Sequence, residues 1–165
     1  GNAGGTNALR TQGWWFALWV MIIDIGKGWV AVALLPSWHL MGEAVSLLSL
    51  PWMQVVCALA VVGGKGAATL VGVVAGLAPA ALIYVLGVWL AGLMLTGFVG
   101  LSTMVATLAF TVWVLISSGP STDPLLYFGL IMMVFVIYTH RSNIQRMLNG
   151  TENRAKKMWL FKPKD

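Results

Sequence analysis

Long apolar runs alternate with short polar segments along this chain. The apolar runs cover residues 13–35, 44–62, 67–95, 98–117 and 125–139. The segments between them contain the Gly, Pro and Ser residues that are typical of turns. A transmembrane helix needs roughly 20 apolar residues, and most of these runs have that length. The pattern therefore predicts an all-α fold, a polytopic integral membrane helical bundle.

The run 67–95 allows two interpretations, because Pro79 lies near its middle. It could form one kinked helix, or two helices that turn near Pro79. With two helices the chain has six segments, and nine of its ten Lys and Arg residues fall on one face. The connections 36–43 and 118–124, on the other face, contain no Lys or Arg. Since cytoplasmic loops are rich in cations, we favour six segments with both ends cytoplasmic.

Composition excludes a soluble domain. Of the 165 residues 59% are apolar and 9% charged, whereas soluble domains contain about 25% charged residues. The net charge of +5 then favours a membrane surface, and we expect no nucleic-acid partner. The single cysteine, Cys57, lies in an apolar run and is expected to be a small buried hydrophobe. We expect one membrane-embedded domain over residues 1–165, with 140–165 as a basic cytoplasmic tail.

The first candidate site is the segment Gly1–Arg10, read as a loop over residues 1–12. Glycines allow backbone N–H groups to approach an anion, and the arginine offers a planar fork that suits phosphate. The alternative is a Gly-rich terminus that frays in solvent. The candidate phosphate ligands in this segment are Gly1, Asn2, Gly4, Thr6, Asn7 and Arg10.

A second candidate anion loop, Gly63–Gly64–Lys65–Gly66, precedes a helix that would begin with Ala67, Ala68 and Thr69. It lacks the Walker pattern, so a nucleotide site is not predicted. A tight turn with a snorkelling lysine is the alternative. Within the span 13–35, Asp24 and Lys27 are three residues apart and are expected to form a structural ion pair, with an ion path as the alternative.

The third candidate site follows the last apolar run. On a continuing helix His140, Asn143 and Arg146 would share one face, and Glu152 follows shortly after them. The alternative is the ordinary basic end of a membrane helix. We find no Ser/His/Asp arrangement and no cluster of metal-ligand residues in the sequence, and we expect neither a metal nor a cofactor. His39 lies in an external connection and is expected to be interfacial.

Together these motifs resemble the bacterial acyl-phosphate:glycerol-3-phosphate acyltransferase family, the PlsY family. The matching patterns are G-N-x-G-x-T-N-x-x-R at 1–10, D-x-x-K-G at 24–28, G-G-K-G-x-A-T at 63–69 and H-R-x-N-I-x-R-x-x-x-G-x-E at 140–152. Each pattern alone has little specificity. Their common order, over nearly the whole chain, makes the resemblance strong.

The resemblance implies a seven-helix enzyme of the bacterial inner membrane with its active site on the cytoplasmic face. Such enzymes transfer a fatty acyl group from acyl-phosphate to the 1-hydroxyl of glycerol 3-phosphate, giving lysophosphatidic acid and phosphate. Carried over to this chain, the catalytic residues would be Arg10, Lys65, His140 and Asn143. The other ligands of substrate and phosphate would be Gly1, Asn2, Gly4, Thr6, Asn7, Gly63, Gly64, Gly66, Thr69, Ser102, Arg146 and Glu152.

Three features differ from the family pattern. The family's leading helix with its serine is absent before Gly1, and its G-H-x-x-P stretch is absent before Gly63. The usual R-Y-V-S-L-S segment reads Gly97-Phe98-Val99-Gly100-Leu101-Ser102, without the cation. A partial chain would account for the first two differences. The alternative function is a non-catalytic PlsY-like subunit with a membrane-protein partner, and a small transporter is a third hypothesis.

Overall fold

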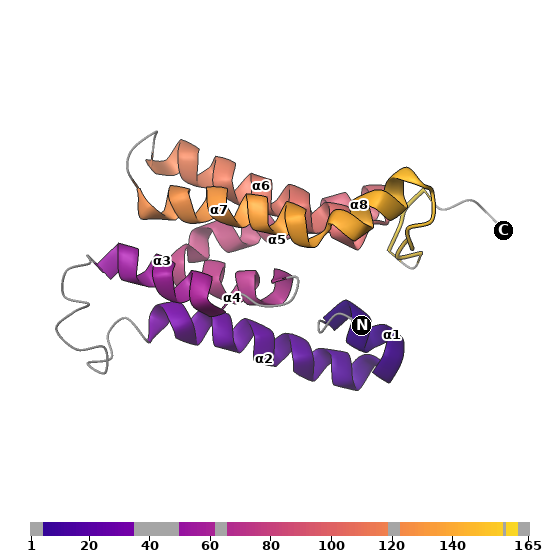
Figure 1. Ribbon diagram of the computed structural model, residues 1–165, viewed down its shortest axis with the longest axis horizontal. Coiled ribbons are helices and arrows are strands. Elements are labelled where there is room, and N and C mark those ends of the chain that lie inside the picture. Colours follow the sequence, from indigo (N-terminus) through magenta and orange to yellow (C-terminus); the bar gives the residue numbers. More distant parts are fainter. Residues whose placement is uncertain (1–4, 35–49, 62–65, 119–122, 157, 162–165) are drawn as a thin grey trace. The chain divides into compact units, whose positions relative to one another are not determined.

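The computed structural model describes residues 5–34, 50–61, 66–118, 123–156 and 158–161, and all regular structure among them is helical (Figure 1). The helices are α1 (Gly5–Gln12), α2 (Trp14–Ala33), α3 (Leu50–Val61), α4 (Ala67–Leu77), α5 (Pro79–Thr96), α6 (Val99–Ser118), α7 (Pro124–Thr139) and α8 (Arg141–Leu148). In the described part of the chain α2, α5 and α6 are long and apolar enough to cross a membrane. This confirms the prediction of an all-α membrane bundle.

The run 67–95 forms two helices, as the charge pattern favoured. Helix α4 ends before Ala78, whose backbone leaves the helical region, and α5 begins at Pro79. Proline has no N–H to donate, so it is tolerated as the first residue of a helix but interrupts one that continues through it. With 11 residues α4 is shorter than a full span, which agrees with the short segment expected at 67–78.

The expectation of a loop over residues 1–12 is wrong for residues 5–12, which form α1. This helix packs along α2 (Figure 1). Its Ala8 is buried, and a Cβ on Gly5 would lie 2.6 Å from the Cγ of Met21. Composition favoured a loop because Gly and Asn are poor helix formers, and tertiary packing overrides that preference here.

The chain divides into two compact units, Gly1–Leu82 and Ile83–Asp165. The expectation of one functional domain stays a prediction. In the first unit α2 packs closely against α4 at three glycines. A Cβ on Gly28 would lie 2.2 Å from the carbonyl oxygen of Thr69, and one on Gly72 would lie 1.9 Å from that of Ile25. Gly76 similarly faces Val32. Small residues of this kind let two membrane helices approach with their backbones in contact.

In the second unit α6 packs against α7, side by side in Figure 1. The rings of Phe110 and Phe128 meet edge to face, and Gly129 leaves room for Thr111. The buried α6 hydroxyls donate back to helical carbonyls: Thr103 to Val99, Thr107 to Thr103 and Thr111 to Thr107. These bonds satisfy the hydrogen-bonding needs of polar groups inside the unit, as the water-free interior of a membrane requires.

The spanning helices expose large apolar side chains, including Trp19 on α2, Ile83 on α5 and Ile116 on α6. A soluble domain rarely exposes such large apolar faces, whereas lipid chains match them.

We predict that Gly28→Ala destabilises the first unit, because the added methyl group meets backbone atoms that cannot turn aside. Overpacking of this kind costs about 1–3 kcal/mol, and the close backbone contact favours the upper end. The measurement is the thermal unfolding midpoint of the purified protein in detergent.

The matched control for this change is Gly26→Ala on the same helix, where an added Cβ meets nothing within 4 Å. It should leave the midpoint unchanged or raise it slightly, since Ala favours the helix over Gly. Equal midpoints for the two variants would contradict the close packing of α2 against α4.

Candidate functional site

Several predicted ligands lie outside the described residues. These are Gly1, Asn2, Gly4, Gly63, Gly64 and Lys65, together with the side chains of Thr6 and Arg10. The backbone of Thr6, Asn7 and Arg10 lies in α1. The carbonyl of Asn7 accepts a hydrogen bond from the hydroxyl of Thr11 at 3.0 Å. Residues 5–10 of the first motif are therefore carried on a short helix, and the role of the motif in phosphate binding stays a prediction.

Gly66 is the last residue of the glycine-rich loop in the second motif and directly precedes α4. Its φ of 73° lies in the left-handed region that favours glycine, and its carbonyl accepts the first bond of the helix from Leu70. Thr69, in the first turn, is buried beneath Gly28. The N-terminus of α4, which leaves backbone N–H donors for an anion, is thus fixed in place by α2.

Asp24 and Lys27 form the expected ion pair on α2. The lysine Nζ lies 2.7 Å from a carboxylate oxygen, and the lysine side chain is 41% exposed. The pair is formed within one helix at i and i+3. Its role in ordering the site remains a prediction.

His140 lies at a bend of 54° between α7 and α8, so the expectation of a continuing helix through this motif is wrong. The bend places the buried His140 at the end of one helix and Asn143 and Arg146 on the next. The His140 Nδ1 lies 2.9 Å from the carbonyl oxygen of Val136. Since a carbonyl can only accept, this hydrogen bond requires the proton on Nδ1.

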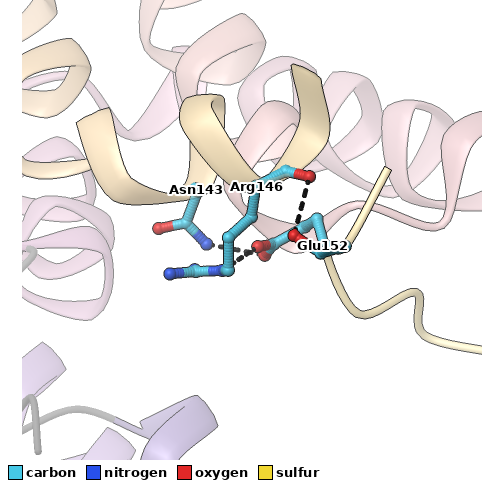
Figure 2. A network of polar contacts seen from close by, with 4 residues as sticks. Asn143, Arg146 and Glu152 are labelled. Carbon is cyan, nitrogen blue, oxygen red and sulfur yellow. Dashed lines mark hydrogen bonds and ion pairs between the residues drawn. The ribbon is translucent and has the colours of Figure 1, made fainter. Parts of the chain in front are cut away.

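Glu152 holds together two residues of the third motif (Figure 2). One carboxylate oxygen accepts from the amide nitrogen of Asn143 at 2.7 Å, and the other accepts from the Nε of Arg146 at 2.5 Å. The Glu152 side chain is only 6% exposed, so its charge is compensated by these partners. The family resemblance implies that Glu152 is a substrate ligand. In the structure its carboxylate is bonded to Asn143 and Arg146.

Gly150 makes the turn that brings Glu152 back to α8. Its φ is 69°, and the N–H groups of Thr151 and Glu152 both donate to the carbonyl of Arg146, at 2.8 and 3.1 Å. This is the common way in which a glycine ends a helix and satisfies its last carbonyls. The G-x-E spacing of the motif therefore has a structural reason.

A tail segment, Arg154–Phe161, described except for residue 157, folds across the end of α5 and was not identified from the sequence. It supplies donors to four successive carbonyls, which a helix end otherwise leaves without partners. Leu160 N bonds to Met94, Trp159 Nε1 to Leu95, Arg154 Nη1 to Thr96 and Ala155 N to Gly97, at distances from 2.7 to 3.3 Å. This contact could not be predicted from a local sequence pattern, because its acceptors are backbone carbonyls, which every residue has.

Gly97, in the segment that differs from the family pattern, lies against the tail segment. Gly97 has a φ of 73°, and a Cβ there would lie 3.1 Å from atoms of Arg154 and Trp159. The Arg154 guanidinium lies over the rings of Phe98 and Trp159, so this segment has a cation beside it although position 97 is glycine.

Gly100 and Ser102 serve the packing of α6. A Cβ on Gly100 would lie 3.2 Å from Asn143, so glycine lets that amide pack closely against α6. Ser102 is fully buried and donates its hydroxyl to the carbonyl of Phe98 at 2.9 Å. A hydroxyl whose hydrogen is already donated is poorly suited to phosphate, which favours packing as the role of Ser102.

Known proteins match this chain over most of its length. A family model described as glycerol-3-phosphate acyltransferase matches residues 1–150. A glycerol-3-phosphate acyltransferase of Synechococcus is 37% identical over 175 residues, covering 99% of this chain and 80% of the relative. One of Chlorobaculum parvum is 33% identical over 188 residues, with 93% and 81% covered. That alignment exceeds the 165 residues of this chain, so parts of the relative have no counterpart here.

Two crystal structures are also similar. They are the glycerol 3-phosphate form and the lysophosphatidic acid form of PlsY, an integral membrane glycerol 3-phosphate acyltransferase. Both have a TM-score of 0.79 and 28% identity to this chain, and they cover 93% of it. In sequence and in helical fold alike, the chain belongs to the glycerol-3-phosphate acyltransferase family.

Proposed function

We propose that this protein transfers a fatty acyl group from acyl-phosphate to the 1-hydroxyl of glycerol 3-phosphate. The products are lysophosphatidic acid and inorganic phosphate. The observation that carries the proposal is the folded third motif, in which one buried carboxylate fixes Asn143 and Arg146 beside the bend at His140. A basic helix end without a function would not need such a buried charged network.

The forms in which PlsY was crystallised support the acceptor and the product. One is the glycerol 3-phosphate form and the other is the lysophosphatidic acid form. The acyl-phosphate donor rests on the motif resemblance. An acyl phosphate is already activated, so this donor requires no protein nucleophile, in agreement with the absence of a Ser/His/Asp arrangement from the sequence.

The reaction is an attack by the glycerol oxygen on the acyl carbonyl carbon. A tetrahedral intermediate forms, the bond from carbon to the phosphate oxygen breaks, and phosphate leaves with the electron pair. The hydroxyl proton passes to the leaving phosphate. Catalysis then consists of positioning the two substrates and stabilising the developing negative charge.

The roles of the residues follow from their chemistry. In the first unit Arg10, Lys65 and the backbone donors of the two glycine-rich motifs would bind phosphate oxygens. In the second unit His140 and Arg146 add donors. With its nitrogen donating to Glu152, the amide of Asn143 has a fixed orientation and would orient the glycerol hydroxyls or phosphate oxygens. Glu152 acts through these two partners as a positioning residue.

We further propose a bacterial inner-membrane location with the motifs on the cytoplasmic face. The support is the distribution of cations, which cluster in the loops and tail assigned to that face. The apolar faces of the helices would then hold the acyl chain.

We predict that the purified protein forms lysophosphatidic acid from palmitoyl-phosphate and labelled glycerol 3-phosphate, and that Lys65→Ala loses this activity. Removing one donor to a developing oxyanion typically lowers the rate by about 100- to 1,000-fold. The measurement is mass-spectrometric detection of the product together with released phosphate. Lys164→Ala, which removes a cation outside the motifs, is the matched control and should retain activity.

The controls for this assay also separate the alternatives. Palmitoyl-coenzyme A in place of palmitoyl-phosphate should give no product. Folded protein that turns over neither donor would contradict the proposed acyltransferase activity and favour a non-catalytic membrane subunit. In that case the next measurement is to identify the proteins that copurify with it.

We predict that Glu152→Gln lowers kcat/KM for glycerol 3-phosphate while leaving the helical fold intact. An amide keeps the shape of the carboxylate but sets an N–H donor against Arg146 or Asn143, so at least one of the two bonds is lost. A lost bond to a charged group costs about 1.5–3 kcal/mol, which is about 10- to 150-fold in rate if it is realised in the transition state.

The control for Glu152→Gln is Thr151→Ala, whose exposed hydroxyl makes only a 3.4 Å bond to the carbonyl of Arg146. It should behave like the wild type. A Glu152→Gln enzyme with unchanged kinetics and an unchanged melting curve would contradict the positioning role.

A further inference from the structure

The tail segment Arg154–Phe161 has a fixed position within the second unit. It is bonded to the last carbonyls of α5, and the ring of Trp159 stacks on Arg154, with 4.0 Å from the guanidinium carbon to the ring centroid. The other ring against this guanidinium is that of Phe98, at 4.4 Å. The orientation of its outward side chains is therefore set by the fold.

These outward side chains are large and apolar. Met158 is 43% exposed, Leu160 62% and Phe161 66%. The tail's contacts with α5 leave these three side chains exposed. Exposed aliphatic and aromatic groups in a short, fixed segment are characteristic of a surface that has a partner.

The same segment is cationic. Its sequence contains three cations, Arg154, Lys156 and Lys157, and no acidic residue. Lys156 is exposed beside the apolar side chains. A partner for this surface must accept apolar groups and compensate positive charge at the same time.

The height of the segment along the helices identifies that partner. It contacts the end of α5 and lies next in sequence after α8, where the apolar spans of the second unit give way to polar residues. In a bilayer crossed by these spans, the ends of the apolar helices would lie where the hydrocarbon layer meets the lipid headgroups. Aromatic and apolar side chains mixed with Lys and Arg are typical of this level, and anionic lipids attract such cations.

We propose that Arg154–Phe161 is a lipid-binding surface that seats in the headgroup layer of a membrane containing anionic phospholipids. Met158, Leu160 and Phe161 enter the layer, and the exposed Lys156 binds lipid phosphates. The proposal does not depend on the acyltransfer reaction, since it concerns the membrane around the protein.

The test uses the full-length protein in lipid nanodiscs with no other protein present. In a Cys57→Ser background, Phe161→Cys carries an environment-sensitive fluorophore. In discs that contain phosphatidylglycerol we predict blue-shifted emission, together with quenching by brominated lipid. In discs of phosphatidylcholine alone, both effects should be weaker. Raising the salt concentration should reduce the difference between the two lipids, because the attraction is electrostatic.

A charge variant supplies the matched control. Lys156→Glu in the same labelled protein should reduce the preference for phosphatidylglycerol several-fold, since one cation at such a surface is worth about fivefold in binding. Unchanged circular dichroism would show that this variant is folded. Emission from position 161 that is water-like in both lipids and quenched by iodide would overturn the proposal, and so would a lipid preference that Lys156→Glu leaves unchanged.

Discussion

The absence of water from the bilayer core constrains the whole structure. Inside it, a backbone or side-chain polar group must find its partner within the protein. Hydroxyls of α6 do so by bonding to carbonyls of their own helix, and the backbones of α2 and α4 approach closely at Gly28 and Gly72. Several residues within or beside the candidate motifs lie where helices end. Among the described residues these include Gly66, Gly97, His140 and Gly150.

Glycine has two different uses at these places. At Gly66, Gly97 and Gly150 it adopts a positive φ, which ends or begins a helix in a way that other residues rarely can. At Gly28, Gly72 and Gly100 it leaves room for a neighbouring backbone or amide. The two uses are linked in the first unit, because the Gly28 contact with Thr69 fixes the helix that begins at Gly66. The motif glycines therefore shape the site, in addition to any role in binding phosphate.

Much of the fold could be predicted from the sequence, because span lengths, Pro79 and the turn residues determine where apolar helices begin and end. The helix over residues 5–12 could not, since it depends on packing against α2. The bend at His140 and the tail bonded to α5 were also missed. The tail depends on contacts between residues about sixty positions apart, as with Trp159 and the Leu95 carbonyl, and any sequence presents carbonyls.

For the candidate site, residue spacing did not show which side chains bond to one another. Glu152 appeared as one more polar residue, and only the structure shows that it joins Asn143 to Arg146. Ser102 looked like a phosphate ligand, and its hydroxyl bonds to Phe98. Gly97 stands where the family pattern has an arginine, and the cation of Arg154 lies against the same segment. Such roles depend on which atoms meet, and residue spacing alone does not determine that.

The most direct test of the proposed reaction is the fate of a heavy-oxygen label placed at the bridging position of the acyl-phosphate. Attack at the acyl carbon breaks the bond from carbon to this oxygen. We therefore predict that all of the label leaves with inorganic phosphate and that the lysophosphatidic acid is unlabelled. Label recovered in free fatty acid would indicate attack at phosphorus, and a complete lack of phosphate release from folded protein would indicate no catalysis. Either result would contradict the proposed acyl transfer.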